Sequence, residues 1–371
     1  MSPGRRVLFP LLLLVLPSGL RGQDAGGGSL PFEIEGLFYL SWLSGEVGGE
    51  DRNAFSVTRS YLTVRTRPLE KLEGRITLDS TQDREGDGRG DMKVRLKYAY
   101  AKYHFGDVGP VRGLGLEGGI VHMVWLDFEE HVNLYRMRDP MFMERSGLFN
   151  SADFGLTLSG DLGESLGEEY TSTVTSSYAA RRGSFAVGVY NGGGYHADER
   201  NTNKVVEGRL TLRPLPDRLP GLQLSGLAIV GEGNREEDAF DAPDWRTYAG
   251  FLSYQHARAT LTAQYAWGRG NQGGSWIDPP NTGAPLEATE FDGYSFFAEA
   301  RPDDHWRLIA GWDRLERTPV TGDESFDRVH AGVGYDLGDR NVLVLDWDRR
   351  TWDDAERPTD TRWRAVMQLR F

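Results

Sequence analysis

The feature that most constrains this 371-residue chain is an alternation of apolar and polar residues that recurs in short segments along its length. In residues 363–371, every second side chain is apolar, and two of the positions between them are arginines. A period of two residues places successive side chains on opposite faces of a β-strand. The chain is therefore expected to consist of strands that each have one apolar face and one face suited to water.

The lengths of the connections between these segments alternate as well. Short turns such as 301–304 and 337–340 follow every second strand, whereas longer polar stretches such as 192–203 and 269–290 follow the others. Short turns on one rim and long loops on the other are typical of outer-membrane β-barrels. This parity predicts sixteen strands, at 32–43, 54–66, 71–82, 92–105, 113–124, 151–162, 184–192, 203–213, 220–231, 244–256, 259–268, 290–301, 304–316, 326–337, 340–350 and 362–371.

The strand count predicts an all-β fold, a closed antiparallel transmembrane β-barrel formed by residues 23–371. Closure matters because an open sheet would leave unpaired backbone groups at its edges in lipid. A barrel of about 16 strands also encloses a channel wide enough for water. The segment 163–183 is ambiguous, since Tyr170 to Ala180 could form another strand, extend its neighbours or fold as an insert. Fourteen or eighteen strands therefore remain alternatives.

The N-terminus predicts export. Arg5 and Arg6 precede an apolar run at 7–16, and small and polar residues follow, which is the order of a secretory signal peptide. The apolar run is too short for a spanning helix, which needs about 20 residues. We assign residues 1–22 to the signal peptide and the remainder to a barrel in the outer membrane of a Gram-negative-type bacterium.

Composition excludes several classes of function. The formal net charge of −13 disfavours nucleic acid as a partner. The chain has no cysteine, its seven histidines are scattered, and it contains no Gly-x-Ser-x-Gly motif. We therefore predict no catalytic residues, no metal site and no cofactor, and we expect that the protein is not an enzyme. A hydrolase whose Ser and His meet only in space on the barrel wall remains an alternative.

The connection 125–150, after the fifth strand, is rich in Phe, Met and Leu as well as in charge. A loop in bulk water need not be so apolar, so this one is predicted to fold into the lumen and to narrow it. A loop that covers the barrel mouth or contacts another subunit is the alternative. As a constriction loop, it would present Asp127, Glu129, Glu130, Asp139, Glu144 and Arg145.

Charged residues on the strands are predicted to face the lumen, because an arginine at the lipid face near the midplane costs about 2–4 kcal/mol. Arg59 is the least secure, since Val57 and Tyr61 share its parity. The two signs nearly balance, so anion and cation preference both remain open, and each charge could simply satisfy a neighbour. The predicted pore-lining residues are Arg59, Arg75, Arg209, Arg307, Arg328 and Arg364; the same face presents Arg213, Arg301, Arg370, Glu73, Asp79, Asp153, Glu207, Glu299, Asp313, Asp336, Asp346 and Asp348.

The final strand is predicted to close the barrel by pairing with the strand near Phe32. Its terminal aromatic residue with alternating apolar partners resembles the signal that the outer-membrane barrel assembly machinery recognises. The residues of this predicted assembly signal are Trp363, Met367, Leu369 and Phe371.

Several motifs resemble the phosphate-selective porin O and P family of Gram-negative bacteria. They are Phe55–Leu62, Leu96–Tyr103, Phe142–Arg145, Ala152–Gly155 with Ser159–Gly160, and Val189–Gly192. The resemblance is best over 53–215, and it implies a 16-stranded, homotrimeric porin with an inward-folded third loop. Members that select phosphate use an arginine ladder and a lysine cluster. This chain has only five lysines, so the resemblance does not extend to phosphate specificity.

Together these features predict a porin, a water-filled channel for passive diffusion of ions, anions among them, and small hydrophilic solutes. Outer-membrane lipid and lipopolysaccharide are its expected surroundings. The alternative from another class is a surface-structural or adhesive barrel that acts through its acidic loops, such as 232–244 and 351–361.

Overall fold

The computed structural model describes residues 32–83, 88–236, 242–278, 287–319 and 323–371. The predicted signal peptide, residues 1–22, lies outside the described residues, so its assignment stays a prediction.

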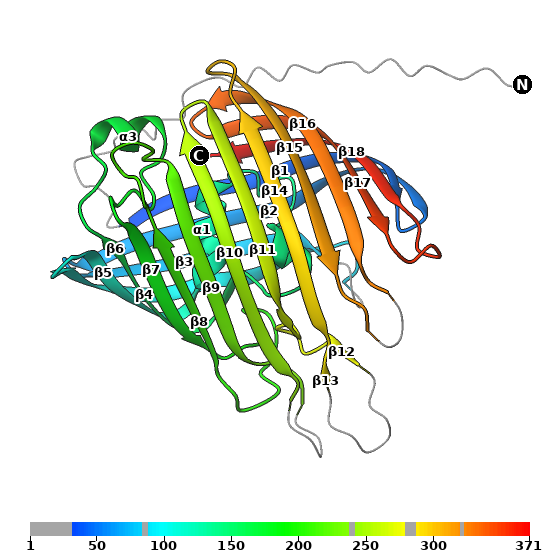
Figure 1. Ribbon diagram of the computed structural model, residues 1–371, viewed down its shortest axis with the longest axis horizontal. Coiled ribbons are helices and arrows are strands. Elements are labelled where there is room, and N and C mark those ends of the chain that lie inside the picture. The colour runs from blue at the N-terminus through cyan, green and yellow to red at the C-terminus, as the bar shows by residue number, and fades with distance from the viewer. Residues whose placement is uncertain (1–31, 84–87, 237–241, 279–286, 320–322) are drawn as a thin grey trace, which may run out of the picture. The chain divides into compact units, whose positions relative to one another are not determined.

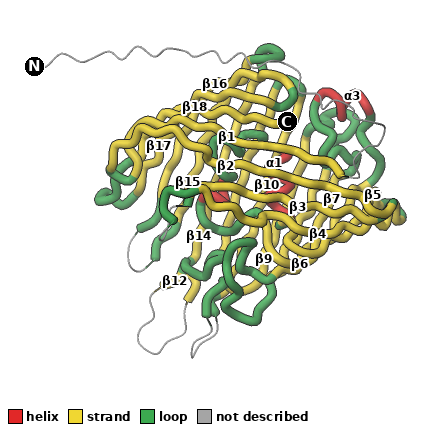
Figure 2. The backbone as a smooth tube through the Cα atoms, turned by 180° about the vertical axis from the view of Figure 1, so that it is seen from behind, coloured by secondary structure: helices red, strands yellow, loops and turns green. Residues whose placement is uncertain are grey.

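A single closed antiparallel sheet forms the barrel, and opposite sides of its wall appear in Figures 1 and 2. Each strand pairs with its neighbours in the sheet, which confirms the sixteen predicted strands. The barrel strands are β1 (Phe32–Val47), β2 (Glu50–Leu69), β3 (Leu72–Gln82), β4 (Met92–Val108), β5 (Val111–His122), β6 (Ala152–Leu162), β7 (Gly183–Tyr190), β8 (Val205–Leu212), β9 (Leu222–Glu232), β10 (Asp244–His256), β11 (Ala259–Arg269), β14 (Glu290–Ala300), β15 (Trp306–Glu316), β16 (Phe326–Gly338), β17 (Asn341–Trp352) and β18 (Asp360–Arg370).

The remaining described elements lie in the connections: α1 (Val124–Val132), α2 (Phe142–Arg145), α3 (Glu168–Thr173) and the short hairpin of β12 (Ile277–Asp278) with β13 (Glu287–Ala288). The alternative of another barrel strand within 163–183 is wrong. This segment instead contains α3 and one isolated antiparallel bridge between Ser165 and Ala180. Among the described residues, no helix combines the length and the apolar character that crossing a membrane requires.

The barrel closes where β18 meets β1, with the register running from Leu37 opposite Arg370 to Glu46 opposite Thr361. Beyond β18, Phe371 exchanges two main-chain hydrogen bonds with Gly36, at 2.8 and 3.0 Å. A Cβ atom at position 36 would come within 2.3 Å of the Phe371 ring. The absence of a Cβ atom at position 36 therefore leaves room for the Phe371 ring against β1. The prediction that the last strand closes the barrel is confirmed.

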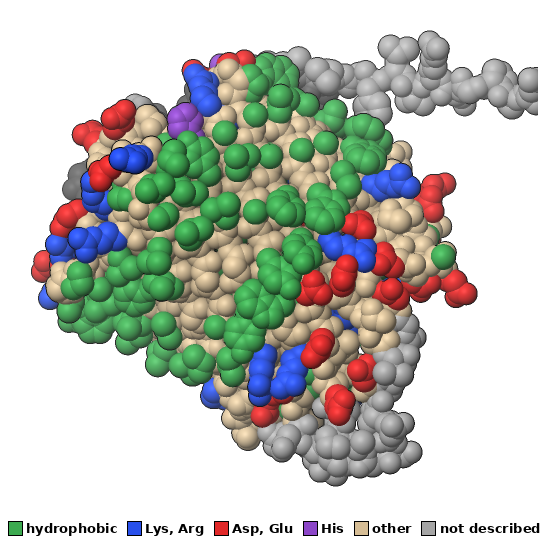
Figure 3. Space-filling view, viewed as in Figure 1, with side chains coloured by type: hydrophobic (Ala, Val, Ile, Leu, Met, Phe, Trp, Pro, Cys, Tyr) green, Lys and Arg blue, Asp and Glu red, His purple; other side chains and the backbone are tan. Residues whose placement is uncertain are grey.

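The outer and inner faces of the wall have the predicted difference in polarity. Along β8, Leu210 and Leu212 are exposed, whereas Glu207, Arg209 and Thr211 are buried on the inner side. In the space-filling view, apolar side chains cover the middle of the wall, and charged ones gather toward its ends (Figure 3). A wall whose outward-facing side chains are mainly apolar is suited to lipid.

A β-bulge in β2 explains why Arg59 and Val57 share a parity although their environments differ. Arg59 pairs with the buried Tyr39, whereas Val57 pairs with the outward-facing Leu40, so Thr58 is the extra residue. An extra residue locally reverses the alternation of the strand. Arg59 accordingly lies on the inner face, where it forms an ion pair of 2.8 Å with Asp79.

Candidate channel interior

The segment 123–150, which joins β5 to β6, begins with a helix held against the inner wall. The main-chain N–H groups of Val124 and Trp125, in the first turn of α1, donate to the Glu207 carboxylate at 3.2 and 3.1 Å. First-turn N–H groups have no acceptor within the helix, so the carboxyl oxygens of Glu207 cap it. Trp125 and Phe128 also pack edge-on against Phe251 of β10. These contacts attach α1 to the part of the wall formed by β8–β10.

The second half of the segment contacts a different part of the wall. Arg138 forms an ion pair of 2.8 Å with Asp346 of β17, and Arg145 forms one of 2.5 Å with Asp313 of β15. All four side chains are largely buried. The segment therefore packs on inward-facing side chains of both β8–β10 and β15–β17.

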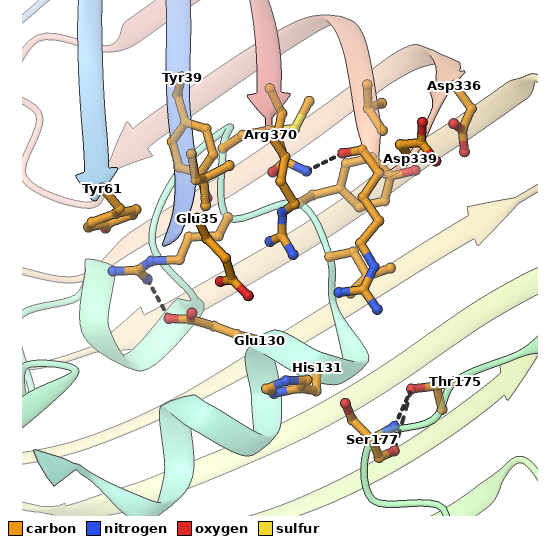
Figure 4. A pocket seen from close by; sticks show the side chains of 18 of the residues that line it. Glu35, Tyr39, Tyr61, Glu130, His131, Thr175, Ser177, Asp336, Asp339 and Arg370 are labelled. Carbon is orange, nitrogen blue, oxygen red and sulfur yellow. Dashed lines mark hydrogen bonds and ion pairs between the residues drawn. The ribbon is translucent and has the colours of Figure 1, made fainter. Parts of the chain in front are cut away.

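A cavity of about 930 Å³ lies between this segment and the wall (Figure 4). In Figure 4, Glu130 and His131 of α1 lie on one side of it, and Tyr39 and Tyr61 lie on the other. Its basic lining residues are Arg65, Arg75, Lys97, Arg136, Arg301, Arg307, Arg340 and Arg370. Its acidic lining residues are Glu35, Asp127, Glu130, Glu299, Asp304, Asp336 and Asp339. The lining thus carries both signs, with basic groups slightly in excess.

The six predicted pore-lining arginines all lie on inner-facing positions but have different surroundings. Arg75 and Arg307 line the large cavity, and Arg59 pairs with Asp79 as described. Arg209 is covered by α1, with its guanidinium 4.5 Å from the centre of the Phe128 ring. The two remaining arginines contact the second half of the segment: Arg328 binds Asp139 at 2.9 Å, and Arg364 donates to the main-chain oxygen of Arg138 at 2.5 Å.

The six predicted constriction-loop residues also differ in their surroundings. Asp127 and Glu130 line the large cavity, where Glu130 also forms an ion pair of 2.9 Å with Arg136. Asp139, Glu144 and Arg145 are engaged in ion pairs, Glu144 with Arg136 of the same segment.

Glu129 is buried and accepts a hydrogen bond of 2.8 Å from the Trp125 indole. Burial raises its pKa to about 8, although the indole hydrogen bond and the charge of Arg145 oppose the shift. This carboxyl group therefore contributes little negative charge at neutral pH.

The sequence pattern did not identify Lys97 and Tyr98, which both face the large cavity. Thr77 pairs with Tyr98 and Leu78 with Leu96, so Lys97 is the extra residue of a bulge in β4. The Lys97 ammonium lies 4.6 Å from the centre of the Tyr61 ring and donates to the Tyr61 hydroxyl at 3.2 Å. Strict alternation places two consecutive residues on opposite faces, so only the strand pairing could reveal this arrangement.

The pattern also missed the role of 163–183, on the short-turn rim. From this connection, Tyr178 packs against Phe128, and its hydroxyl donates a hydrogen bond to the Asp127 carboxylate. Burial alone would raise the pKa of Asp127, but His122, His131, this hydroxyl and Arg75 together hold it below its usual range. An insert between β6 and β7 thus supports α1 and keeps a negative charge at the cavity.

No model of a known protein family matches the chain, and a search of the curated proteins gives no match. Solved structures do match. OmpF of Salmonella typhi, in complex with daunomycin, is 15% identical with a TM-score of 0.60, over 92% of this chain and 97% of that one. The outer-membrane channel DcaP of Acinetobacter baumannii is 12% identical with a TM-score of 0.57, over the same shares. OmpT, an outer-membrane protein of Vibrio cholerae, is 11% identical with a TM-score of 0.59, over 93% and 99%.

At such identities the likeness establishes the fold. The chain is a porin-like, closed β-barrel of the outer-membrane type, in agreement with the apolar outer wall. The matching structures support the general porin-like part of the family resemblance and do not single out the phosphate-selective O and P family.

Proposed function

We propose that the protein is a porin, a channel in the Gram-negative outer membrane through which ions and small hydrophilic solutes diffuse passively. The observation that carries this proposal is the cavity of about 930 Å³ inside the barrel, lined by charged and polar side chains. A barrel with a purely structural role has no need of a charged interior of this size. That a solved neighbour is described as an outer-membrane channel supports the same conclusion.

Within this proposal, the uncovered charges set the selectivity. Asp127 and Glu130 from α1 and Arg75 and Arg307 from the wall line the same cavity. Charged side chains that line a narrow pore set the sign of the ions it prefers. Because basic groups slightly outnumber acidic ones in this lining, we expect a weak preference for anions.

Planar-bilayer recording under a KCl gradient tests both statements. We expect stable stepwise openings and a reversal potential on the anion side. Asp127→Asn and Glu130→Gln should move the reversal potential further toward anions. Asp217→Asn, which removes an exposed carboxylate from the β8–β9 turn, is the matched control and should leave it unchanged. A protein that inserts but never conducts would refute the porin and favour the surface-structural barrel.

We further propose a homotrimer that is assembled by the barrel assembly machinery and surrounded by lipopolysaccharide. One of the similar structures, OmpT of Vibrio cholerae, is described in a trimer form. Size measurement of the detergent-solubilised protein by light scattering tests the assembly, and a monomer of unchanged mass at all concentrations would refute it.

Among the acids of the last loop, Asp353 pairs with Arg314 and Asp360 with Arg350, both at 2.6 Å, which leaves fewer of these carboxylates for adhesion.

A further inference from the structure

A network of buried charges joins residues 138–145 to the inner wall, and its arginines outnumber its aspartates by one. Each member forms an ion pair with at least one other member, and no nitrogen–oxygen distance in these pairs exceeds 3.6 Å. The network has no further acidic partner among the described residues. Its members are Arg138, Arg145, Arg328, Arg362 and Arg364 on one side, and Asp139, Asp313, Asp346 and Asp348 on the other.

A small cavity of about 40 Å³ lies beside this network and shares one lining residue, Tyr135, with the large one. Arg138, Arg145, Arg328 and His330 all line it. Each of these residues has buried nitrogen atoms without a hydrogen-bond partner among the described residues: Nη2 of Arg138, Nε of Arg145, Nη1 of Arg328, and Nδ1 and Nε2 of His330. The exposed fractions of Arg138, Arg328 and His330 are only 8%, 3% and 6%.

The position of His330 depends on a glycine across the strand pair. Gly311 of β15 lies opposite His330 of β16, and a Cβ atom at 311 would come within 2.4 Å of His330 Nε2. The imidazole therefore lies close over the β15 backbone. In either neutral tautomer, one of its ring nitrogens is an N–H donor that lacks an acceptor.

Asp139 and Asp313 also line the small cavity, but the acids there do not accept hydrogen bonds from these nitrogen atoms. Arg328 Nη1 lies 3.6 Å from Asp313, which is beyond hydrogen-bond distance. Glu129 also lines the small cavity, but burial raises its pKa to about 8, so at neutral pH it is mostly uncharged. Buried donors are costly when nothing accepts from them.

We propose that the small cavity binds one small monovalent inorganic anion, such as chloride, between residues 138–145 and strands β15 and β16. Such an ion accepts hydrogen bonds from several directions, and it would neutralise the excess arginine. The volume suits an ion about the size of water and excludes organic carboxylates and phosphate esters. Phe142 and Phe297 line the same cavity, and a weakly hydrated halide tolerates such apolar neighbours. This ion would fix the segment to the wall whether or not the barrel conducts.

Crystals of the full protein grown in sodium bromide test the proposal directly. Bromide is similar to chloride in size and has the same charge, so it can occupy the same site, and its anomalous scattering locates it. We expect an anomalous peak within hydrogen-bond distance of Arg145, Arg328 and His330. Water density without an anomalous peak at this position would overturn the proposal. The result does not depend on conductance, so it separates this proposal from that of a porin.

Thermal unfolding gives an independent measurement in solution. When chloride replaces gluconate at equal ionic strength, we expect a saturable rise of about 2–4 °C in the unfolding midpoint. His330→Leu removes both ring nitrogens and should abolish the rise, whereas His256→Leu, at the rim of β10, should retain it. An equal rise in gluconate, or a rise that His330→Leu leaves intact, would refute specific binding. If His330→Leu does not fold, the bromide crystals of the unaltered protein still decide the question.

Discussion

A glutamine in place of Glu129 tests how one buried carboxyl group couples segment 123–150 to pH. Glu129 is only 5% exposed and accepts the hydrogen bond from the Trp125 indole. Burial raises its pKa from about 4.5 to about 8; the nearby charges of Glu130 and Glu144 add to the shift, while the indole and Arg145 oppose it. The substituted glutamine would keep an oxygen acceptor for the indole and would be uncharged at every pH.

The sign of the effect follows from the raised pKa. A group whose pKa is higher in the folded state contributes stability that is fully present below its unfolded pKa, near 4.5, and that is lost as pH rises to about 8. Across this window the loss is about 1.4 kcal/mol per pH unit, or roughly 5 kcal/mol in all. Glu129→Gln should remove this part of the pH dependence.

Tryptic cleavage of the native protein between pH 5 and pH 9 measures the opening of the segment, since Arg136 and Arg138 are buried when it is packed on the wall. Rates are corrected for the pH dependence of trypsin on a peptide substrate. We expect cleavage of the unaltered protein to accelerate with pH and that of Glu129→Gln to change much less. Glu169→Gln, at an exposed position of α3, should behave as the unaltered protein. Parallel profiles for the unaltered protein and Glu129→Gln would refute the reasoning.

Three further substitutions test other contacts of the interior and of the closure. Glu207→Leu leaves two N–H groups of α1 without an acceptor, at about 1–3 kcal/mol each, so hydrogen exchange in α1 should accelerate. Tyr178→Phe removes the hydroxyl bound to Asp127, a charged hydrogen bond of about 1.5–3 kcal/mol, and should increase single-channel current noise; unchanged noise would contradict it. Gly36→Ala should displace the Phe371 ring and lower the temperature at which the barrel unfolds on SDS gels, whereas Gly226→Ala, with open space at its Cβ position, should not.

The strands could be predicted from the sequence because strand geometry places successive side chains on opposite faces, and because one face is suited to lipid and the other to water. A residue such as Leu210 is exposed on the outer face, and its neighbour Arg209 faces inward. The alternation of connection lengths then supplied the strand count, and the terminal run ending at Phe371 supplied the site of closure. These signals lie within each segment or in its spacing, so a single sequence carries them.

The bulges at Thr58 and Lys97 could not be predicted, because a bulge is a property of a strand pair. Thr58 and Lys97 carry no local mark that distinguishes them from paired residues. Each becomes visible only through the register with its partner strand. The bulge at Thr58 explains why Val57 and Arg59 have different environments although they share a parity. The bulge at Lys97 adds a second cavity-facing residue beside Tyr98.

The alternation of apolar and polar residues also did not indicate which parts of the inner wall are covered by another segment. Arg75 and Arg209 are both arginines on barrel strands, and both side chains face inward. Arg75 lines the large cavity, whereas α1 covers Arg209. The difference arises from long-range contacts of segment 123–150, whose apolar residues indicated that it folds inward but not where on the wall it packs.

This division gives the interior charges two separate roles. Arg328 and Arg364, covered by residues 138–145, hold the segment in place through Asp139 and the main chain, so their removal should act first on stability. Arg75 and Arg307 have access to the cavity, so their removal should act first on ion preference. In the proposed channel, selectivity would therefore depend on the charges that the segment leaves uncovered, and a substitution that shifts the segment should change the selectivity without altering a charge.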